Sequence, residues 1–266
     1  MKRPLDQLAD IAYNAIQIAA QKITQSRPGT VIEKSDRDTY TDIDLDIERE
    51  IKSYLSQVTP ELGFAGEEQG LSENFREGDP FWALDPIDGT SNFVHGVPLS
   101  AAQLALIDES GSAVVAVIAL PYQGMYYQAT KGEGSHVNGS RIHVSRTPLL
   151  RQAIVSMGDY AVGKHSEERN RKRIKITAGL ANNVERIRMF GSAAHDLAWL
   201  AEGRIDGVVI LSNNLMDMAA GTLIAAEAGA LLLDTKGDSY HPRSSDLVAG
   251  TPKILEELLA ITRGAD

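Results

Sequence analysis

The chain has 266 residues, of which 43% are hydrophobic and 23% charged, a composition typical of a soluble globular protein. Its formal net charge of −10 excludes a general attraction to nucleic acid or to an anionic membrane. It contains no cysteine, which excludes thiol nucleophiles, thiolate zinc sites and disulfides and fits a cytoplasmic location. We expect no signal peptide and no membrane span, because no apolar run approaches the ~20 residues that a span needs.

The first elements along the chain are two predicted helices. Apolar residues recur at helical spacing from Leu5 to Ile23, and Pro28-Gly29 then interrupts the pattern. The second helix carries isoleucine and leucine on one stripe between positions 43 and 55. Its start resembles a capping box, with Thr41 followed three residues later by Asp44 in place of the usual Glu.

Short strands are predicted next, from Phe64 to about Val144. The clearest are Phe81 to Leu84, Ala102 to Leu106, Ala113 to Leu120 and Met125 to Thr130. Glycines at 132 and 134 and the pair Asn138-Gly139 predict hairpin turns between the later strands.

Strands and helices alternate beyond a junction around Pro148. Strands are predicted at Ala153 to Ser156, Gly207 to Leu211 and Leu231 to Leu233, and helices at Glu167 to Ala181, Ala193 to Ala201, Ala219 to Ala228 and after Pro252. We interpret the basic residues from Arg169 to Lys175 as the solvated face of one of these helices. The pattern predicts an α+β protein in two halves, residues 1–146 and 147–266.

The sharpest local signal is the segment Asp85-Pro86-Ile87-Asp88-Gly89-Thr90, directly after a predicted strand. Two carboxylates three residues apart at a strand end can converge on one hard cation, and Mg²⁺ prefers such oxygen ligands. Gly89 lets the backbone approach an anion, so that the N–H groups of Gly89 and Thr90 can face a phosphate. Taken alone, the same letters also fit a polar turn that caps a helix.

Three further acidic positions each have a structural and a functional interpretation. Glu67 follows a short apolar stretch, where a glutamate pair fits an exposed surface as well as a ligand. Asp217 precedes Met218-Ala219-Ala220-Gly221 and fits a helix N-cap as well as a ligand. Asp44 fits the capping box, a role in the site, or both.

Taken together, these segments resemble the inositol monophosphatase family of lithium-sensitive sugar and nucleotide phosphatases. Gly66-Glu67-Glu68 is similar to the family's first acidic motif, Asp85 to Asn92 to its central signature and Asp217 to Gly221 to its C-terminal motif. Further matches in the same order are Lys34, Thr41 to Asp44, Arg188 to Ala194 and Glu227 to Gly229. The resemblance covers almost the whole chain, and it implies a layered α/β/α/β/α sandwich and a homodimer.

Carried over residue by residue, the resemblance implies two Mg²⁺ ions at one site. Glu67, Asp85 and the carbonyl of Ile87 would hold the first ion. The second ion would lie between Asp85, Asp88 and Asp217, and Glu67 would also touch a weaker third. Activity would therefore require metal.

The same resemblance implies a catalytic set and a phosphate site. Thr90, hydrogen-bonded to Asp44, would orient the water on the first metal beside Glu67. The phosphate would contact Gly89, Thr90, Ser192, Ala193 and Asp217. The five acids sum to −5 at neutral pH and would repel a phosphate, but two divalent ions offset four of these charges.

Two departures from the family pattern bear on the substrate. Met216 stands where Trp usually precedes the last aspartate, and Ile210 stands where a Glu commonly hydrogen-bonds the polyol. An isoleucine cannot bond a sugar hydroxyl, so the site loses that discrimination for inositol. Asn213, Asn214 and His195 are polar residues near the predicted pocket that could replace this contact, although His195 also fits a structural histidine of its helix.

The sequence therefore predicts a phosphatase acting on a small-molecule phosphate monoester, an inositol phosphate or another sugar or polyol phosphate. A nucleotide, histidinol phosphate or another biosynthetic intermediate stays an alternative substrate. A non-catalytic binding or regulatory protein on this fold is a further alternative; it would be expected to lack Asp85, Asp88 or Thr90, which are all present. Asp42, Asp44 and Asp46 alternate like a haloacid dehalogenase motif, but they follow no apolar strand.

Overall fold

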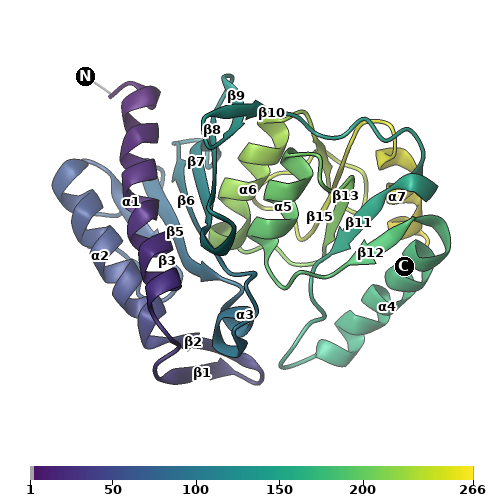
Figure 1. The fold of residues 1–266 in the computed structure, drawn as a ribbon, viewed down its shortest axis with the longest axis horizontal. Coiled ribbons are helices and arrows are strands. Elements are labelled where there is room, and N and C mark those ends of the chain that lie inside the picture. Colours follow the sequence, from purple (N-terminus) through teal and green to yellow (C-terminus); the bar gives the residue numbers. More distant parts are fainter. Residues whose placement is uncertain (1–2, 266) are drawn as a thin grey trace.

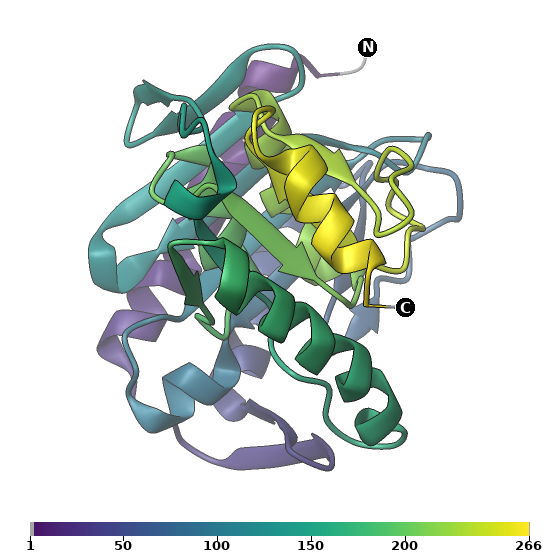
Figure 2. The same cartoon turned by 90° about the vertical axis from the view of Figure 1, so that its right-hand side faces the viewer.

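Two large β-sheets and three layers of helices form the body of residues 3–265, the part of the chain that the computed structural model describes (Figure 1). One pair of helices covers the outer face of the first sheet, a second pair lies between the sheets, and a third covers the outer face of the second sheet (Figures 1 and 2). In that order the pairs are α1 (Leu5–Gln25) and α2 (Asp42–Val58), α5 (Ala193–Ala201) and α6 (Leu215–Glu227), and α4 (Ser166–Asn183) and α7 (Leu255–Arg263). The predicted α/β/α/β/α sandwich is confirmed.

The first sheet has eight strands, and among them only β3 and β5 pair in parallel. In spatial order its strands are β10 (Ser140–Ile142), β9 (Gly134–Val137), β8 (Met125–Thr130), β7 (Ala113–Leu120), β6 (Ala101–Ile107), β5 (Phe81–Asp88), β3 (Gly63–Gly66) and β4 (Gly70–Leu71). Side chains alternate across it: Leu104 and Leu106 of β6 pack toward α1, whereas Ala105 and Ile107 pack toward α5 and α6. Both faces are therefore buried.

The second sheet has five strands and comes from the later part of the chain. Its order is β12 (Arg186–Arg188), β11 (Ile154–Met157), β13 (Gly207–Ile210), β15 (Leu247–Gly250) and β14 (Leu231–Leu233). The neighbours β11 and β13 run parallel, with Met157 opposite Val209, so their carboxyl ends lie side by side. This edge faces the acidic motifs of the first sheet.

Smaller elements complete the fold. A separate two-stranded ribbon joins β1 (Val31–Ser35) to β2 (Asp38–Thr41), and the short helix α3 (Thr90–His95) follows β5. The ribbon, β12 and β15 were not predicted. The Asn138-Gly139 hairpin is confirmed, since both residues have positive φ, 47° and 79°, between β9 and β10.

The start of α2 forms the predicted capping box. The Thr41 hydroxyl accepts hydrogen bonds from the backbone of Ile43 and Asp44, and the Asp44 carboxylate accepts one from the Thr41 backbone at 2.8 Å. Asp44 is buried by this arrangement. The cap therefore holds Asp44, one of the predicted site residues, through a partner only three residues away in the sequence.

The interpretation of the basic run on α4 as a solvated face is wrong at one position. Arg173 is only 5% exposed, and its guanidinium donates to the carbonyls of Leu211, at 2.7 Å, and Asp159, at 3.3 Å. It thus ties α4 to the segments that follow β11 and β13. Among residues 3–265, no helix combines the length and the apolar character needed to cross a membrane.

Candidate metal centre

Three carboxylates from distant parts of the sequence meet at one point. Ligand oxygens of Glu67, Asp85 and Asp217 all lie within 4.8 Å of one another. Glu67 follows β3, and its backbone N–H donates to the Leu84 carbonyl of the parallel strand β5 at 3.2 Å, which places Glu67 beside Asp85. Asp217 arrives from the first turn of α6, held by a 3.0 Å hydrogen bond from Gln103 to its carbonyl.

Asp85 is the most deeply placed of these acids. It is 2% exposed, its Oδ1 has no hydrogen-bond partner, and its Oδ2 accepts one bond of 3.4 Å from Gln103. Burial, followed by the charges of Glu67, Asp88 and Asp217, raises the pKa of Asp85 well above its usual value. A buried carboxylate with an unbonded oxygen and acidic neighbours fits a divalent cation, and an all-oxygen ligand set fits Mg²⁺.

A local irregularity in β5 turns Asp85 and Asp88 to the same side of the sheet. Residues three apart on a regular strand face opposite sides. Here Asp85 pairs with Gln103 and Asp88 with Ala101, so β5 has one residue more than β6 between the two pairs. The extra residue forms a β-bulge, and as a result Asp85 and Asp88 face the same side of the sheet.

Asp88 lies beside the three-acid cluster and is held by the N-terminus of α5. Its Oδ2 accepts hydrogen bonds of 2.6 Å from the Ser192 hydroxyl and from the Ala194 backbone. Burial raises the pKa of Asp88 to about 6, although these hydrogen bonds oppose the shift. Ser192 and Ala193, predicted as phosphate contacts, both hydrogen-bond Asp88 and so help to position it, and both line the adjacent cavity.

The predicted hydrogen bond between Thr90 and Asp44 is absent among the described residues. The Thr90 hydroxyl donates to the Ile87 carbonyl at 3.0 Å, and Asp44 accepts from the backbone and the hydroxyl of Thr41. Burial raises the pKa of Asp44 to about 6. Oδ2 of Asp44 therefore accepts its hydrogen bonds from Thr41 in the cap of α2, and not from Thr90 as predicted.

A lysine on the β1–β2 ribbon supplies positive charge at the edge of the cluster. The Lys34 ammonium lies 2.9 Å from Glu67 and 2.5 Å from Glu68. Burial opposes the charge on Lys34, but the hydrogen bond to Glu68 and the charge of Glu67 outweigh it and raise the lysine pKa. The ribbon therefore offsets part of the negative charge of the site.

Gly89 provides the close backbone approach that the sequence predicts. Its φ is +83°, and a Cβ at this position would lie 2.9 Å from the Gly191 carbonyl and 3.0 Å from the Leu99 carbonyl. Only glycine fits both the backbone conformation and the space, so β5 can turn directly into α3 beside the acids.

A cavity of about 160 Å³ adjoins Asp88 and Asp217, but the three polar residues predicted near the pocket, Asn213, Asn214 and His195, have other roles. Asn213 donates to the Pro242 carbonyl. Asn214 caps α6, a role that the sequence also allowed for Asp217. His195 is fully buried and bonds Ser192 at 2.8 Å, and burial lowers its pKa to about 4. None of these three lines the cavity.

The polar residues that line this cavity and were not predicted are Asp159, Asp196 and Ser212, and Gly158 lies beside them. Asp159 follows a predicted strand and Ser212 follows another, so their positions at strand ends were the available signal. Ile210, which the sequence places at the substrate pocket, does line this cavity.

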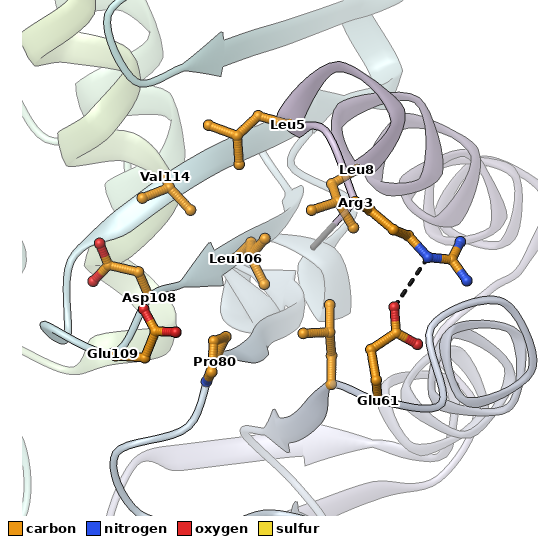
Figure 3. Close-up of a pocket in the computed structure, with 10 residues that line it drawn as sticks. Arg3, Leu5, Leu8, Glu61, Pro80, Leu106, Asp108, Glu109 and Val114 are labelled. Atoms are coloured by element: carbon orange, nitrogen blue, oxygen red, sulfur yellow. Dashed lines mark ion pairs between the residues drawn. The ribbon is translucent and has the colours of Figure 1, made fainter. Parts of the chain in front are cut away.

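A larger cavity of about 460 Å³ lies at the other end of β5, and within residues 3–265 no group of potential metal ligands lies there (Figure 3). Leu5, Leu8 and Leu106 line it, and Arg3 pairs with Glu61 at its edge at 3.0 Å. Its lining includes Pro80, just before β5, whereas Asp85 and Asp88 stand toward the opposite end of that strand. The larger cavity is therefore not the one that adjoins the metal centre.

The chain also matches a known protein family over nearly its whole length. A model of the inositol monophosphatase family matches residues 4–265. The chain belongs to the inositol monophosphatase family. The family match makes the protein a phosphatase, an enzyme that hydrolyses phosphoric monoesters.

Relatives of known name are similar over most of their length. A Nus factor SuhB of Xylella fastidiosa is 32% identical over 97% of this chain and 94% of its own. The inositol-1-monophosphatase ImpA of Mycolicibacterium smegmatis is 30% identical over 89% of this chain and 84% of its own. A solved IMPase of Thermotoga maritima superposes with a TM-score of 0.88 at 29% identity, covering 98% of each chain.

Proposed function

We propose that this phosphatase is Mg²⁺-dependent and hydrolyses the phosphate monoester of a small soluble molecule. The observation that carries the proposal is the meeting of Glu67, Asp85 and Asp217 within 4.8 Å around a buried, unbonded carboxylate oxygen. Such a site is electrostatically unfavourable without cations, and its oxygen ligands suit magnesium. The names of the relatives support a monophosphatase reaction.

The ligand assignment is the one that the family resemblance implies, and the meeting of Glu67, Asp85 and Asp217 supports it. Glu67, Asp85 and the Ile87 carbonyl would hold one ion, and Asp85, Asp88 and Asp217 a second, with a weaker third at Glu67. When bound, two such ions activate a water molecule and stabilise the leaving oxygen. They also offset the charge that would otherwise repel a phosphate.

The chain's own residues orient this centre. Ser192 and the α5 backbone hold Asp88, and the Thr41 cap holds Asp44. Thr90 is positioned by the Ile87 carbonyl, 3.0 Å away, at the turn where Gly89 lets the backbone come close. Phosphoryl transfer depends mainly on such positioning and on charge stabilisation.

Phosphate release tests this function. The full-length protein is assayed on a panel of sugar, polyol, nucleotide and amino-alcohol monoesters, together with p-nitrophenyl phosphate, with Mg²⁺ and after chelation by EDTA. We expect release from at least one monoester that requires Mg²⁺ and that Asp85→Asn abolishes. Asp10→Asn is the matched control, because Asp10 is exposed on α1. Hydrolysis that survives EDTA and Asp85→Asn would contradict the proposal.

The regulatory alternative has less support in this chain. Relatives named Nus factor SuhB share about a third of its residues, but the acids and Thr90 that catalysis needs are all present. Retention of a buried acidic cluster is costly for a protein that only binds a partner.

We also infer a cytoplasmic homodimer. The absence of cysteine suits a reducing compartment, and the dimer rests on the family resemblance. Light scattering after size-exclusion chromatography would show twice the 28.8 kDa of the chain, and the chain mass alone would contradict the dimer.

A further inference from the structure

His195 lies in the first turn of α5, the helix whose start holds Asp88, and its side chain has no access to solvent. Its exposed fraction is 0%, and α5 lies between the two sheets, so that the helix is covered from both sides (Figure 1). Trp199, one turn later on α5, packs edge-to-face against the imidazole, with ring centroids 5.3 Å apart and ring planes at 88°. This packing holds the imidazole in one orientation.

Among the described residues, Ser192 is the only polar partner of the His195 side chain. The histidine Nδ1 lies 2.8 Å from the Ser192 Oγ, whereas its Nε2 is buried and has no partner. A buried nitrogen without a partner costs free energy, and a leucine of similar volume would avoid that cost. Packing alone therefore does not account for a histidine at this position.

The hydrogen bonds of Ser192 decide which nitrogen of His195 carries the proton. Asp88 is ionised when it holds a cation and then only accepts, so the Ser192 hydroxyl donates its single proton to the Asp88 Oδ2 at 2.6 Å. One lone pair of the Ser192 Oγ accepts from the His195 backbone N–H at 3.2 Å, and the other is available to Nδ1. The contact between Oγ and Nδ1 is therefore a hydrogen bond only if Nδ1 is the donor.

The charge state of the imidazole agrees with this assignment. Burial lowers the pKa of His195 to about 4, so the ring is neutral near pH 7 and carries one proton. A proton on Nε2 would have no acceptor within residues 3–265, and Nδ1 and Oγ would then face each other as two acceptors. A proton on Nδ1 completes the hydrogen bonds of the Ser192 hydroxyl, which gives one and receives two.

We infer that His195 is a positioning residue of the metal centre and acts through Ser192 on Asp88. Its Nδ1–H fixes the Ser192 hydroxyl so that the hydroxyl proton points at Asp88. A hydroxyl that accepts hydrogen bonds also donates more strongly, because linked hydrogen bonds polarise one another. The series His195–Ser192–Asp88 therefore orients the carboxylate for a cation. The inference rests on the proposed function, in which Asp88 is a ligand of the second Mg²⁺ ion.

The position of the proton can be measured directly. Long-range proton–nitrogen correlation spectra of the isotope-labelled, full-length protein distinguish the Nδ1–H form of a histidine from the Nε2–H form. The signals that disappear in His195→Leu identify this residue among the six histidines. We expect the neutral Nδ1–H form at neutral pH in the presence of Mg²⁺. The Nε2–H form, or a charged ring, would overturn the inference.

Variants of His195 test its effect on the metal. Calorimetric titration with Mg²⁺ measures binding directly, and the Mg²⁺ dependence of phosphate release gives a second value. We expect His195→Leu to weaken Mg²⁺ binding about three- to tenfold, the factor that one hydrogen bond contributes. His195→Asn keeps a donor near the position of Nδ1 and should retain most of the affinity, whereas His195→Gln places its amide near Nε2 and should not. His143→Leu is the control, because His143 is exposed.

Thermal unfolding in EDTA separates positioning from a purely structural role. A structural histidine would lower the Tm in both the Leu and the Asn variant and leave Mg²⁺ binding unchanged, and this result would overturn the inference. If His195 acts through Ser192, adding His195→Leu to Ser192→Ala should weaken Mg²⁺ binding no further. Additive losses in the double variant would show another route and would also contradict the inference.

The same titrations distinguish this inference from the proposed function. If His195→Leu binds Mg²⁺ as tightly as the unmodified protein while phosphate release still requires Mg²⁺, the inference fails and the proposed function stands. If the unmodified protein binds no Mg²⁺ and releases no phosphate from any monoester, both fail.

Discussion

At the scale of single residues, the carboxylates of the site differ in burial and in how they are held: Asp44, Asp85 and Asp88 are buried, whereas Glu67 and Asp217 are partly exposed. Asp88 accepts two short hydrogen bonds from the start of α5, whereas Asp85 has an oxygen without any partner. Hydrogen bonds fix the direction of a ligand, and an unbonded oxygen is free to coordinate. The two aspartates therefore have different tasks, although both belong to one short motif.

Replacing Asp217 by Asn tests whether charge is the essential property. Asn has nearly the same shape but cannot offset a divalent ion, so we expect Asp217→Asn to lower kcat by about 100-fold or more without lowering the Tm in EDTA. Phosphate release at saturating Mg²⁺ and thermal unfolding give the two values. Near-normal turnover would contradict the ligand assignment.

Ser192→Ala tests the positioning of Asp88. The change removes the 2.6 Å hydrogen bond to Asp88, and we expect about a 10- to 100-fold loss in the apparent affinity for Mg²⁺. A titration of activity against Mg²⁺ measures the effect. Ser56→Ala is the control, because Ser56 is exposed on α2 and bonds only its own helix. If both variants require the same Mg²⁺ concentration, Ser192 does not act through Asp88.

At the scale of elements, the position of α6 depends on its close packing against α5. A Cβ on Gly221 would lie 2.8 Å from the Cβ of Leu197 and 2.5 Å from its Cδ1. Since Asp217 lies one turn earlier on α6, the contact sets how far this ligand reaches toward Asp85. The small-residue stretch that the sequence shows at this helix thus serves its packing.

Gly221→Ala should therefore destabilise the protein. We expect a loss of about 1–3 kcal/mol in the free energy of unfolding, because the added methyl group overpacks the contact with Leu197. Denaturant unfolding measures this loss. Gly264→Ala at the end of α7 is the control, since its φ is −69° and its Cβ would come no closer than 3.4 Å to another atom, the Ala260 carbonyl oxygen. A larger loss in the control would show that the α5–α6 contact is not the cause.

At the scale of the whole molecule, a chain with a net charge of −10 gathers carboxylates in its interior. Burial raises the pKa of Asp44 and Asp88 to about 6 and that of Asp196 to about 8 in the metal-free protein. Each folded pKa exceeds the ordinary 3.8. The folded state therefore binds more protons than the unfolded state above about pH 4.

The sign of the pH dependence follows. The stability that these groups contribute is fully present below about pH 4 and is lost as the pH rises through about 6 to 8. We expect the Tm of the EDTA-treated protein to fall between about pH 5 and pH 8. Mg²⁺ should raise the Tm most at about pH 8, where the carboxylates are ionised without it. Thermal scans at fixed ionic strength test this, and a Tm that rises with pH in EDTA would contradict it.

Long elements with a regular pattern were predictable from the sequence alone. Helices α1 and α2 and strands β7 and β8 follow the expected ranges, because a helix or a strand with one buried face repeats its apolar residues at a fixed period. The ribbon of β1 and β2 was missed, since its residues are mostly exposed and show no such period. The helix predicted at Glu167 to Ala181 is confirmed as α4, but the burial of Arg173 depends on the carbonyls of Asp159 and Leu211, which come from other segments of the chain.

By itself, the sequence determined the types and order of the acidic motifs, the cap at Thr41 and the turn at Gly89, because these depend on neighbours within a few residues. Only the tertiary structure decided that Glu67, Asp85 and Asp217 meet, that Asn213 and Asn214 are engaged elsewhere, and that Asp159 and Ile210 line one cavity with Asp217. Strand order and helix docking bring such residues together through packing between distant segments, which leaves no local pattern in the chain.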